Sequence, residues 1–318
     1  MTPSFPTRPG RRAVLALAAA AALPRHGRAA ERVVRIGVQK YGTLVVLRER
    51  RELEPMLKSQ GWGVSWHEFP SGPPLLEALT AGALDFGTTG EAPPIFAQAA
   101  GSMLLYAGFE PPSPAGEAIL VPQASAIRTL ADLKGRTVAL NKGSNVHYLL
   151  VQALASAGLR PADVSTAYLA PADARAAFER GAVDAWAIWD PFLAAAQDAT
   201  GARVLADATD LAPNRQFFLA ARDFARDQPE LLRTILGQVD ATDRWAEANQ
   251  DATTRLLAAS MSLPAPVIAR AVARTGYGVR PLTPEVVADQ QRIADTFHDL
   301  RLIPAKLDVA GAVWEPRA

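Results

Sequence analysis

Residues 137–145 read Thr-Val-Ala-Leu-Asn-Lys-Gly-Ser-Asn and are the clearest indication of the fold class. The apolar run at its start is typical of a buried strand, and the polar Asn-Lys-Gly-Ser-Asn that follows is typical of a loop. Val146, Leu149 and Leu150 come next at helical spacing. The stretch therefore predicts a strand that passes through a loop into a helix, which is the unit from which parallel sheets are built.

A similar unit occurs nearer the N-terminus. Val34–Val38 followed by Gln39–Gly42 resembles residues 137–144, and Gly82–Phe86 parallels Gly181–Ala185. Two similar halves of alternating strands and helices are predicted, although two unrelated α/β stretches with common turns would give the same pattern. The helix expected before each parallel segment has apolar residues at helical spacing: Leu75, Leu76 and Leu79 in one copy, Ala174, Ala177 and Phe178 in the other.

The rest of the chain predicts how the halves are joined. The proline-rich residues 109–116 cannot form a helix interior or a central strand, so we expect them to cross between lobes. A short strand is predicted at Gln216–Ala221, followed by a helical tail that returns to the first lobe. The predicted architecture is α/β, with two lobes that each hold a mixed, mainly parallel sheet flanked by helices, and a ligand cleft between them. Lobe I comprises residues 30–112 and 217–318, lobe II residues 113–216, and the tail helices lie at about 229–248, 251–261, 264–274 and 283–300.

The N-terminus resembles an export signal. Arg8, Arg11 and Arg12 precede the apolar run Ala13–Leu23, and small residues follow near Ala29. This run is too short to span a bilayer, which requires roughly 20 apolar residues. We predict that residues 1–29 are a signal peptide, through either the Sec or the twin-arginine route, and that the mature protein is periplasmic. Because the chain has no cysteine, a lipid anchor on that residue is not expected.

Composition excludes several classes of function. The 318 residues are 49% hydrophobic, which suits about two domains with real cores. The chain has 33 Lys+Arg, 32 Asp+Glu and a net charge of +1, so it lacks the strongly basic character of a nucleic-acid-binding protein. The lack of cysteine excludes disulfides, thiolate nucleophiles and Cys-ligated metal sites. No metal, cofactor or catalytic motif is predicted, so we do not expect an enzyme.

The loops that face the predicted cleft suggest an anion site. Ser144 or Asn145 is placed to cap the helix that follows, and Gly143 lets the backbone turn. The residues Thr88–Gly90 precede another predicted helix in the other lobe. Two helix N-termini can hold a small oxyanion through N–H groups and hydroxyls. The alternative is that Ser144 and Thr89 only cap their helices.

Other side chains near these loops have two possible roles. The aromatic Tyr41 and Trp189 lie at strand exits, where they could line a pocket. Glu91 and Asp190 occupy equivalent places in the halves and could form a general acid/base pair, or pair with the amine of a taurine-like ligand. The alternative is that each acid is present only because the helix dipole favours it. His147 could donate to a ligand or lie beside it.

Several segments of the chain resemble the aliphatic sulfonate-binding periplasmic proteins of ABC importers. They are residues 36–43, 85–98, 113–122, 141–147 and 189–192. The resemblance is dense over about residues 33–220 and looser in the tail. This sequence departs from the pattern of many relatives at Thr88-Thr89, where an aromatic residue followed by Thr is expected. It implies a type II periplasmic binding protein fold. The ligand-binding residues that it implies are Gln39, Tyr41, Gly42, Thr43, Thr89, Gly90, Glu91, Ser113, Gly116, Ser144, Asn145, His147, Trp189 and Asp190.

The resemblance implies a protein that captures alkanesulfonates and delivers them to an inner-membrane ABC permease for sulfur supply, and we expect it to be a monomer. The alternatives are a binding protein for taurine, nitrate, bicarbonate or a pyrimidine precursor, or an exported enzyme on the same fold. A protein that uses its lobes to present a partner-binding surface is a further class. From the helix-start hypothesis we predict that Ser144→Ala and Thr89→Ala each weaken binding by about 1–3 kcal/mol.

Overall fold

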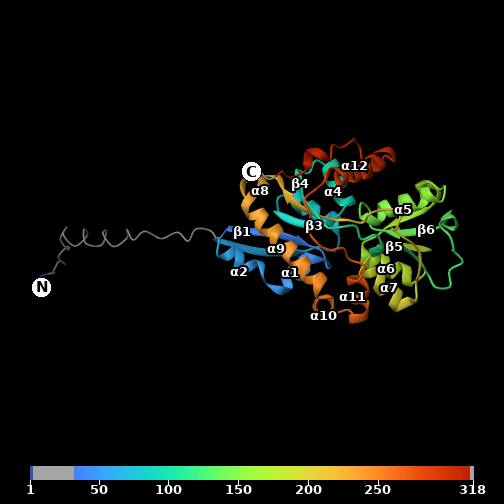
Figure 1. The fold of residues 1–318 in the computed structure, drawn as a ribbon, viewed down its shortest axis with the longest axis horizontal. Helices are drawn as coiled ribbons and strands as arrows, with labels where there is room; N and C mark the ends of the chain where they lie inside the picture. Colours follow the sequence, from blue (N-terminus) through green and yellow to red (C-terminus); the bar gives the residue numbers. More distant parts are fainter. Residues whose placement is uncertain (3–31, 316–318) are drawn as a thin grey trace. The chain divides into compact units, whose positions relative to one another are not determined.

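The computed structural model describes residues 1–2 and 32–315 and contains two five-stranded sheets (Figure 1). We call the part built on the sheet β2-β1-β3-β10-β4 lobe I, and the part built on the sheet β7-β6-β8-β5-β9 lobe II. Lobe I has β1 (Arg32–Val38), β2 (Trp62–Glu68), β3 (Phe86–Gly90), β4 (Leu104–Phe109) and β10 (Gln216–Ala221). Lobe II has β5 (Glu117–Val121), β6 (Thr137–Leu140), β7 (Ser165–Tyr168), β8 (Ala185–Trp189) and β9 (Arg203–Asp207).

The internal repeat is present in the hydrogen bonds of both sheets. The Asp85 carboxylate accepts from the backbone N–H of Arg35 at 2.8 Å, and the Asp184 carboxylate accepts from that of Thr137 at 2.8 Å. In lobe I this bond joins the turn before β3 to β1, and in lobe II it joins the turn before β8 to β6; the strands of each pair are parallel. An antiparallel strand lies on the other side, β10 beside β3 and β5 beside β8. The repeated Gly-x-x-Asp turn thus sets the same strand register twice.

Helices cover both sheets, because each helix buries its apolar face against a sheet or a neighbouring helix. In lobe I, α3 contacts β3 and α4, while α9 lies against α1 and α12 against α4 (Figure 1). In lobe II, α5, α6 and α7 all contact β8. The lobe I helices before the crossing are α1 (Thr43–Arg50), α2 (Leu53–Lys58), α3 (Gly72–Thr80) and α4 (Ala92–Ala99). Lobe II contains α5 (Asn145–Ser156), α6 (Pro171–Glu179) and α7 (Phe192–Thr200), with short 3₁₀ helices at Pro114–Gly116, Leu130–Leu133 and Pro161–Asp163.

The helical tail agrees closely with the sequence prediction. Its helices are α8 (Arg222–Asp227), α9 (Pro229–Ala248), α10 (Gln250–Met261), α11 (Ala265–Val272) and α12 (Pro284–Asp299), before a 3₁₀ turn at Ala310–Ala312. The prolines predicted as start signals lie in the first turn of α9 and α12. The tail covers lobe I with α9 and α12, and α11 also contacts α7 of lobe II.

Two segments cross between the lobes and are bonded to each other. The N–H of Ser113, in the proline-rich link after β4, donates to the carbonyl of Pro213 at 3.1 Å. The side-chain amide of Asn214, before β10, donates to the carbonyl of Ser113 at 2.9 Å. The two crossings therefore form one connected pair next to the sheets' strand ends.

One local prediction was wrong. The residues Thr88–Gly90 were expected in a loop, but they belong to β3, where Gly90 pairs with Gln216 of β10. The strand is longer because β10 supplies a partner from a distant part of the chain.

Two expectations concern export and membranes. The predicted signal peptide, residues 1–29, lies outside the described residues except for its first two. Across 32–315, none of the helices is both long and apolar enough to cross a membrane.

Candidate functional site

A cavity of about 1010 Å³, including its opening to solvent, is lined by residues of both lobes. Strand ends, helix starts, both crossings and the end of α11 all contribute to the wall. The lining residues are Gln39, Lys40, Tyr41, Gly42, Thr43, Pro70, Gly72, Thr88, Gly90, Pro93, Glu110, Ser113, Gly116, Ser144, Asn145, Trp189, Asp190, Pro191, Phe192, Asn214, Gln216, Ala271, Arg274 and Thr275.

The start of α1 is one polar part of this wall. Gly42 precedes the helix with φ 107°, a conformation that favours glycine, and its carbonyl accepts from the N–H of Val45 at 3.0 Å. The N–H groups at the first helical positions, Thr43 and Leu44, have no partner within the helix. Gly42 and Thr43 line the cavity, so the positive end of the α1 dipole lies at it.

The start of α5 is the matching part in lobe II. Ser144 is the residue before the helix, but its hydroxyl donates to the carbonyl of Asn141 at 2.7 Å rather than capping the helix. Ser144 and Asn145 line the cavity, and the first-turn N–H groups of Asn145 and Val146 lack helical partners. The units that contain α1 and α5 are the two copies of the sequence repeat, so the two helix starts are equivalent.

The start of α4 does not have the donors that we expected. The N–H of Ala92 donates to the side-chain oxygen of Asn145 at 3.1 Å, and the next residues, Pro93 and Pro94, have no N–H. The helix pair that offers free N–H groups to the cavity is therefore α1 and α5, not α4 and α5. The Asn145 side chain also donates to Asn214 at 2.8 Å, so it connects the lobes beside the cavity.

Most of the residues predicted from the sequence line the cavity together, but three do not. Thr89 is fully buried and its hydroxyl donates to the carbonyl of Gly90 at 3.0 Å, while Thr88 takes its place in the lining. Glu91 is buried and accepts from the backbone N–H groups of Asn214 and Arg215 at 3.2 and 3.1 Å. Burial raises the pKa of Glu91 to about 7 against the effect of these bonds.

His147 lies in an aromatic cluster instead of the cavity lining. Its ring contacts those of Phe96, Tyr168 and Phe297, with centroids 5.6–6.1 Å apart. Its Nδ1 accepts from the N–H of Gly143 at 3.3 Å, so it fixes the turn before α5. Burial, aided by Lys142, lowers the pKa of His147 to about 4, so the ring is neutral at neutral pH.

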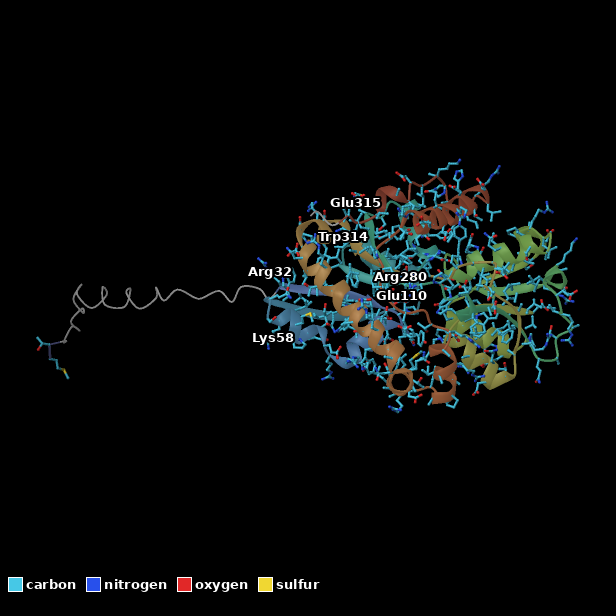
Figure 2. The ribbon with its side chains drawn as sticks, in the orientation of Figure 1. Arg32, Lys58, Glu110, Arg280, Trp314 and Glu315 are labelled. Atoms are coloured by element: carbon cyan, nitrogen blue, oxygen red, sulfur yellow. The ribbon has the colours of Figure 1, made fainter. Side chains whose placement is uncertain are left out.

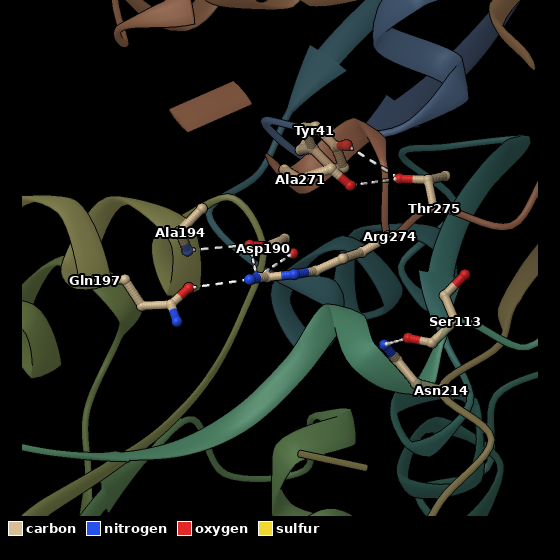
Figure 3. A network of polar contacts seen from close by, with 9 residues as sticks. All are labelled: Tyr41, Ser113, Asp190, Ala194, Gln197, Asn214, Ala271, Arg274 and Thr275. Carbon is tan, nitrogen blue, oxygen red and sulfur yellow. Dashed lines mark hydrogen bonds and ion pairs between the residues drawn. The ribbon is translucent and has the colours of Figure 1, made fainter. Parts of the chain in front are cut away.

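Sequence reasoning missed several lining residues. Glu110, Asn214, Gln216, Arg274 and Thr275 come from the crossings, β10 and the end of α11, and nothing in their local pattern pointed to a site. The hydroxyls of Tyr41 and Thr275 lie 3.1 Å apart, which joins the β1–α1 loop to the tail (Figure 3).

Arg274 is the main electrostatic feature of the cavity. Its guanidinium donates to both oxygens of Asp190, at 3.3 and 3.1 Å, and to Gln197 at 3.1 Å (Figure 3). The Asp190 side chain is 5% exposed and that of Arg274 is 23% exposed, so the pair is largely removed from water. Burial raises the pKa of Asp190, and Arg274 opposes that rise. Since Asp190 belongs to lobe II and Arg274 to the tail of lobe I, the pair connects the lobes.

Among the residues that the structure describes, no three His, Asp or Glu side chains lie together as a group that could hold a metal ion.

Comparison with known families gives one match over most of the chain. The model of the NMT1-like family matches residues 36–262. The taurine-binding periplasmic protein of Escherichia coli is 29% identical over 199 residues, with 61% of each chain covered.

Solved structures give closer matches. The periplasmic aliphatic sulphonate-binding protein SsuA of Escherichia coli is 46% identical and superposes with a TM-score of 0.82, covering 90% of this chain and 92% of that one. The alkanesulfonate-binding protein SsuA of Xanthomonas axonopodis pv. citri, solved bound to MOPS, is 43% identical with a TM-score of 0.85, covering 89% of this chain and 98% of that one.

Proposed function

The chain belongs to the NMT1-like family and has the type II periplasmic binding protein fold, and on that premise we propose that it captures alkanesulfonates for an ABC importer. In this proposal the protein works in the periplasm as a monomer and delivers its ligand to an inner-membrane permease for sulfur supply. It binds its ligand without turnover. The relatives that carry this proposal are sulfonate-binding proteins at 43–46% identity.

The observation that carries the proposal is that the N-termini of α1 and α5 line one cavity together with the rings of Tyr41 and Trp189. A sulfonate is a permanent monoanion with three acceptor oxygens and no proton to give, so it suits N–H and hydroxyl donors. The cationic Arg274 and Lys40 lie in the same wall. An alkyl tail suits the rings of Tyr41 and Trp189, which would be unused by nitrate or bicarbonate.

Taurine is a weaker candidate because neither of the two carboxylates that we considered for its ammonium group is free in the cavity, and the other carboxyl in the lining, that of Glu110, is buried and bonded to Thr43. Asp190, the carboxylate that we considered for this role, already accepts two hydrogen bonds from Arg274. Glu91, the other one, lies outside the lining and is bonded to the β10 crossing. A sulfonate with an uncharged tail therefore fits the cavity better than one with an amine.

Calorimetric titration of residues 30–318 with ethanesulfonate, hexanesulfonate, MOPS, taurine and sulfate tests the proposal. We expect one site per chain, affinity that rises with alkyl length, weaker binding of taurine and none of sulfate. A ligand at a hundred times its Kd should also stabilise the fold by about 2.7 kcal/mol. If the folded protein gives no heat with any sulfonate, the ligand belongs to another class.

Ser144→Ala should weaken sulfonate binding by about 1–3 kcal/mol, because Ser144 lines the cavity and its hydroxyl can rotate from the Asn141 carbonyl to donate to a ligand oxygen. Thr89→Ala is the matched control, because Thr89 is fully buried outside the cavity lining, and we expect the affinity to stay close to that of the parent chain. Calorimetry of both variants checks this. An equal loss of affinity in both variants would mean that the Ser144 hydroxyl does not bind the ligand.

A further inference from the structure

The Thr43 hydroxyl lies between two buried carboxyl groups at the edge of the cavity. It is 2.9 Å from Oε1 of Glu110 and also within hydrogen-bond distance of Oδ1 of Asp243. The three side chains are at most 5% exposed. Thr43 and Glu110 line the cavity, and Asp243 reaches them from α9.

Hydrogen counting shows that this arrangement needs an additional proton. A hydroxyl carries one hydrogen, whereas ionised carboxylates can only accept. Thr43 can donate to one of its two neighbours, so the other contact needs a proton on a carboxyl group. The other oxygen of Asp243 accepts from the N–H of Gly278 at 3.1 Å, which leaves Oδ1 for the contact with Thr43.

We propose that Glu110 and Asp243 hold a shared proton through Thr43, and that they are positioning residues whose proton makes sulfonate affinity depend on pH. The inference rests on the proposed function, because it requires an anion in the cavity. Through Thr43, the first residue of α1, the pair fixes the helix start that faces the ligand.

The surroundings favour retention of the proton near neutral pH. Burial raises the pKa of Asp243 to about 7 and holds that of Glu110 well above its usual range, and the charge of Asp243 raises the latter further. On α9, Asp240 and Glu247 add negative charge, although Asp240 pairs with Arg244.

The N-terminus of α1 also lies at the pair, and the positive end of its dipole opposes the rise in pKa. Tyr41 and Tyr277 face the two carboxyls with hydroxyls whose pKa values are raised by burial, so both are neutral. Asp190 is paired with Arg274. Figure 2 labels Arg280 beside Glu110; the Arg280 backbone pairs with Phe109, and its side chain is exposed.

A sulfonate in the cavity would act on this proton. If the pair loses the proton, a second negative charge stands at the wall that holds the anion, and binding weakens. By reciprocity, bound sulfonate raises the affinity of the pair for the proton. Binding should therefore take up protons, and affinity should fall as the pH rises through the range in which the free pair titrates.

The test is calorimetry of residues 30–318 with hexanesulfonate, whose charge does not change, between pH 6 and 9 in buffers of different ionisation enthalpy. We expect proton uptake, and an association constant that falls by up to about tenfold per pH unit at its steepest. Glu110→Gln and Asp243→Asn should each reduce the uptake and flatten the profile, while binding at pH 6 persists in at least one of them. Glu230→Gln is the control, an exposed acid on the same helix that pairs with Arg233.

Titration of the ligand-free protein separates this inference from the proposed function. Carboxyl ¹³C shifts should show a Glu110 or Asp243 resonance that stays protonated above pH 6 and is lost in the matching variant. If that signal is present and no sulfonate binds, the proposed function fails and the shared proton stands. If both carboxyls ionise below pH 5, or sulfonate binds with no proton uptake, the inference is overturned.

Discussion

Gly90→Ala should reduce sulfonate affinity by about a hundredfold or more, because the new methyl group would overlap the Asn145 side chain. That side chain cannot move aside cheaply, since it is buried and holds Ala92 and Asn214 through hydrogen bonds. Loss of both bonds would remove a connection between the lobes beside the cavity and displace the start of α5. We also expect the free energy of unfolding to fall by about 1–3 kcal/mol from overpacking.

Gly116→Ala is the matched control for this substitution. Gly116 also lines the cavity, but a methyl group there would meet Asn214 at 3.4 Å, an ordinary contact. Calorimetry and urea unfolding of the two variants should therefore differ clearly. Comparable affinity in both would show that the position of Asn145 does not matter for binding.

Arg274→Ala should be the most damaging single change to the electrostatics of the cavity. It leaves the Asp190 carboxylate buried without its cation, and breaking such a pair costs about 3–5 kcal/mol of stability. It also leaves an uncompensated negative charge in the wall, which repels a sulfonate. We expect affinity to drop by at least about tenfold, as measured by calorimetry at pH 7.

The pH dependence of that variant gives a specific signature. Burial already raises the pKa of Asp190, and without Arg274 the pKa rises further. Protonation of Asp190 removes the repulsion, so the affinity of Arg274→Ala should improve as the pH falls. The double variant Arg274→Ala/Asp190→Asn should regain part of the lost affinity at pH 7 if the repulsion is the cause.

Arg270→Ala is the control for Arg274→Ala. Arg270 also joins α11 to α7, through Asp198, but both side chains are 41–50% exposed. Pairs in water contribute about 0–1 kcal/mol, so this variant should bind and unfold almost as the parent chain does. A loss as large as that of Arg274→Ala would place the effect in the helix contact and not in the cavity.

The sequence predicted correctly those elements whose pattern lies within a short stretch of the chain. Helical spacing and proline starts located α9 and α12 nearly to the residue, and the repeated Gly-x-x-Asp turns predicted two equivalent sheets. The repeat also brought the start of α5 to the site, because strand ends of parallel sheets meet at one edge.

The rest depended on contacts between distant segments. The loop expected at Thr88–Gly90 is a strand because β10 pairs with it. Asn145 lies in the cavity lining as expected, and the contact of its side-chain oxygen with Ala92 was not predicted. The two prolines after Ala92 have no N–H, so α4 lacks the donors that we expected there. Arg274 and Glu110 became visible only when the tail and the crossing were placed against the cavity. Whether the lining residues bind a ligand remains a prediction.

The position of β10 has a consequence for biosynthesis. It lies between β3 and β4, yet it is made after all of lobe II. The strands of lobe II are contiguous in the chain, so that sheet can form while β3 and β4 still lack their shared neighbour. Until Gln216–Ala221 leaves the ribosome, both strands have open edges that invite pairing with other chains. We therefore expect chains truncated before Gln216 to aggregate or to need a chaperone, although they contain every strand of the second lobe.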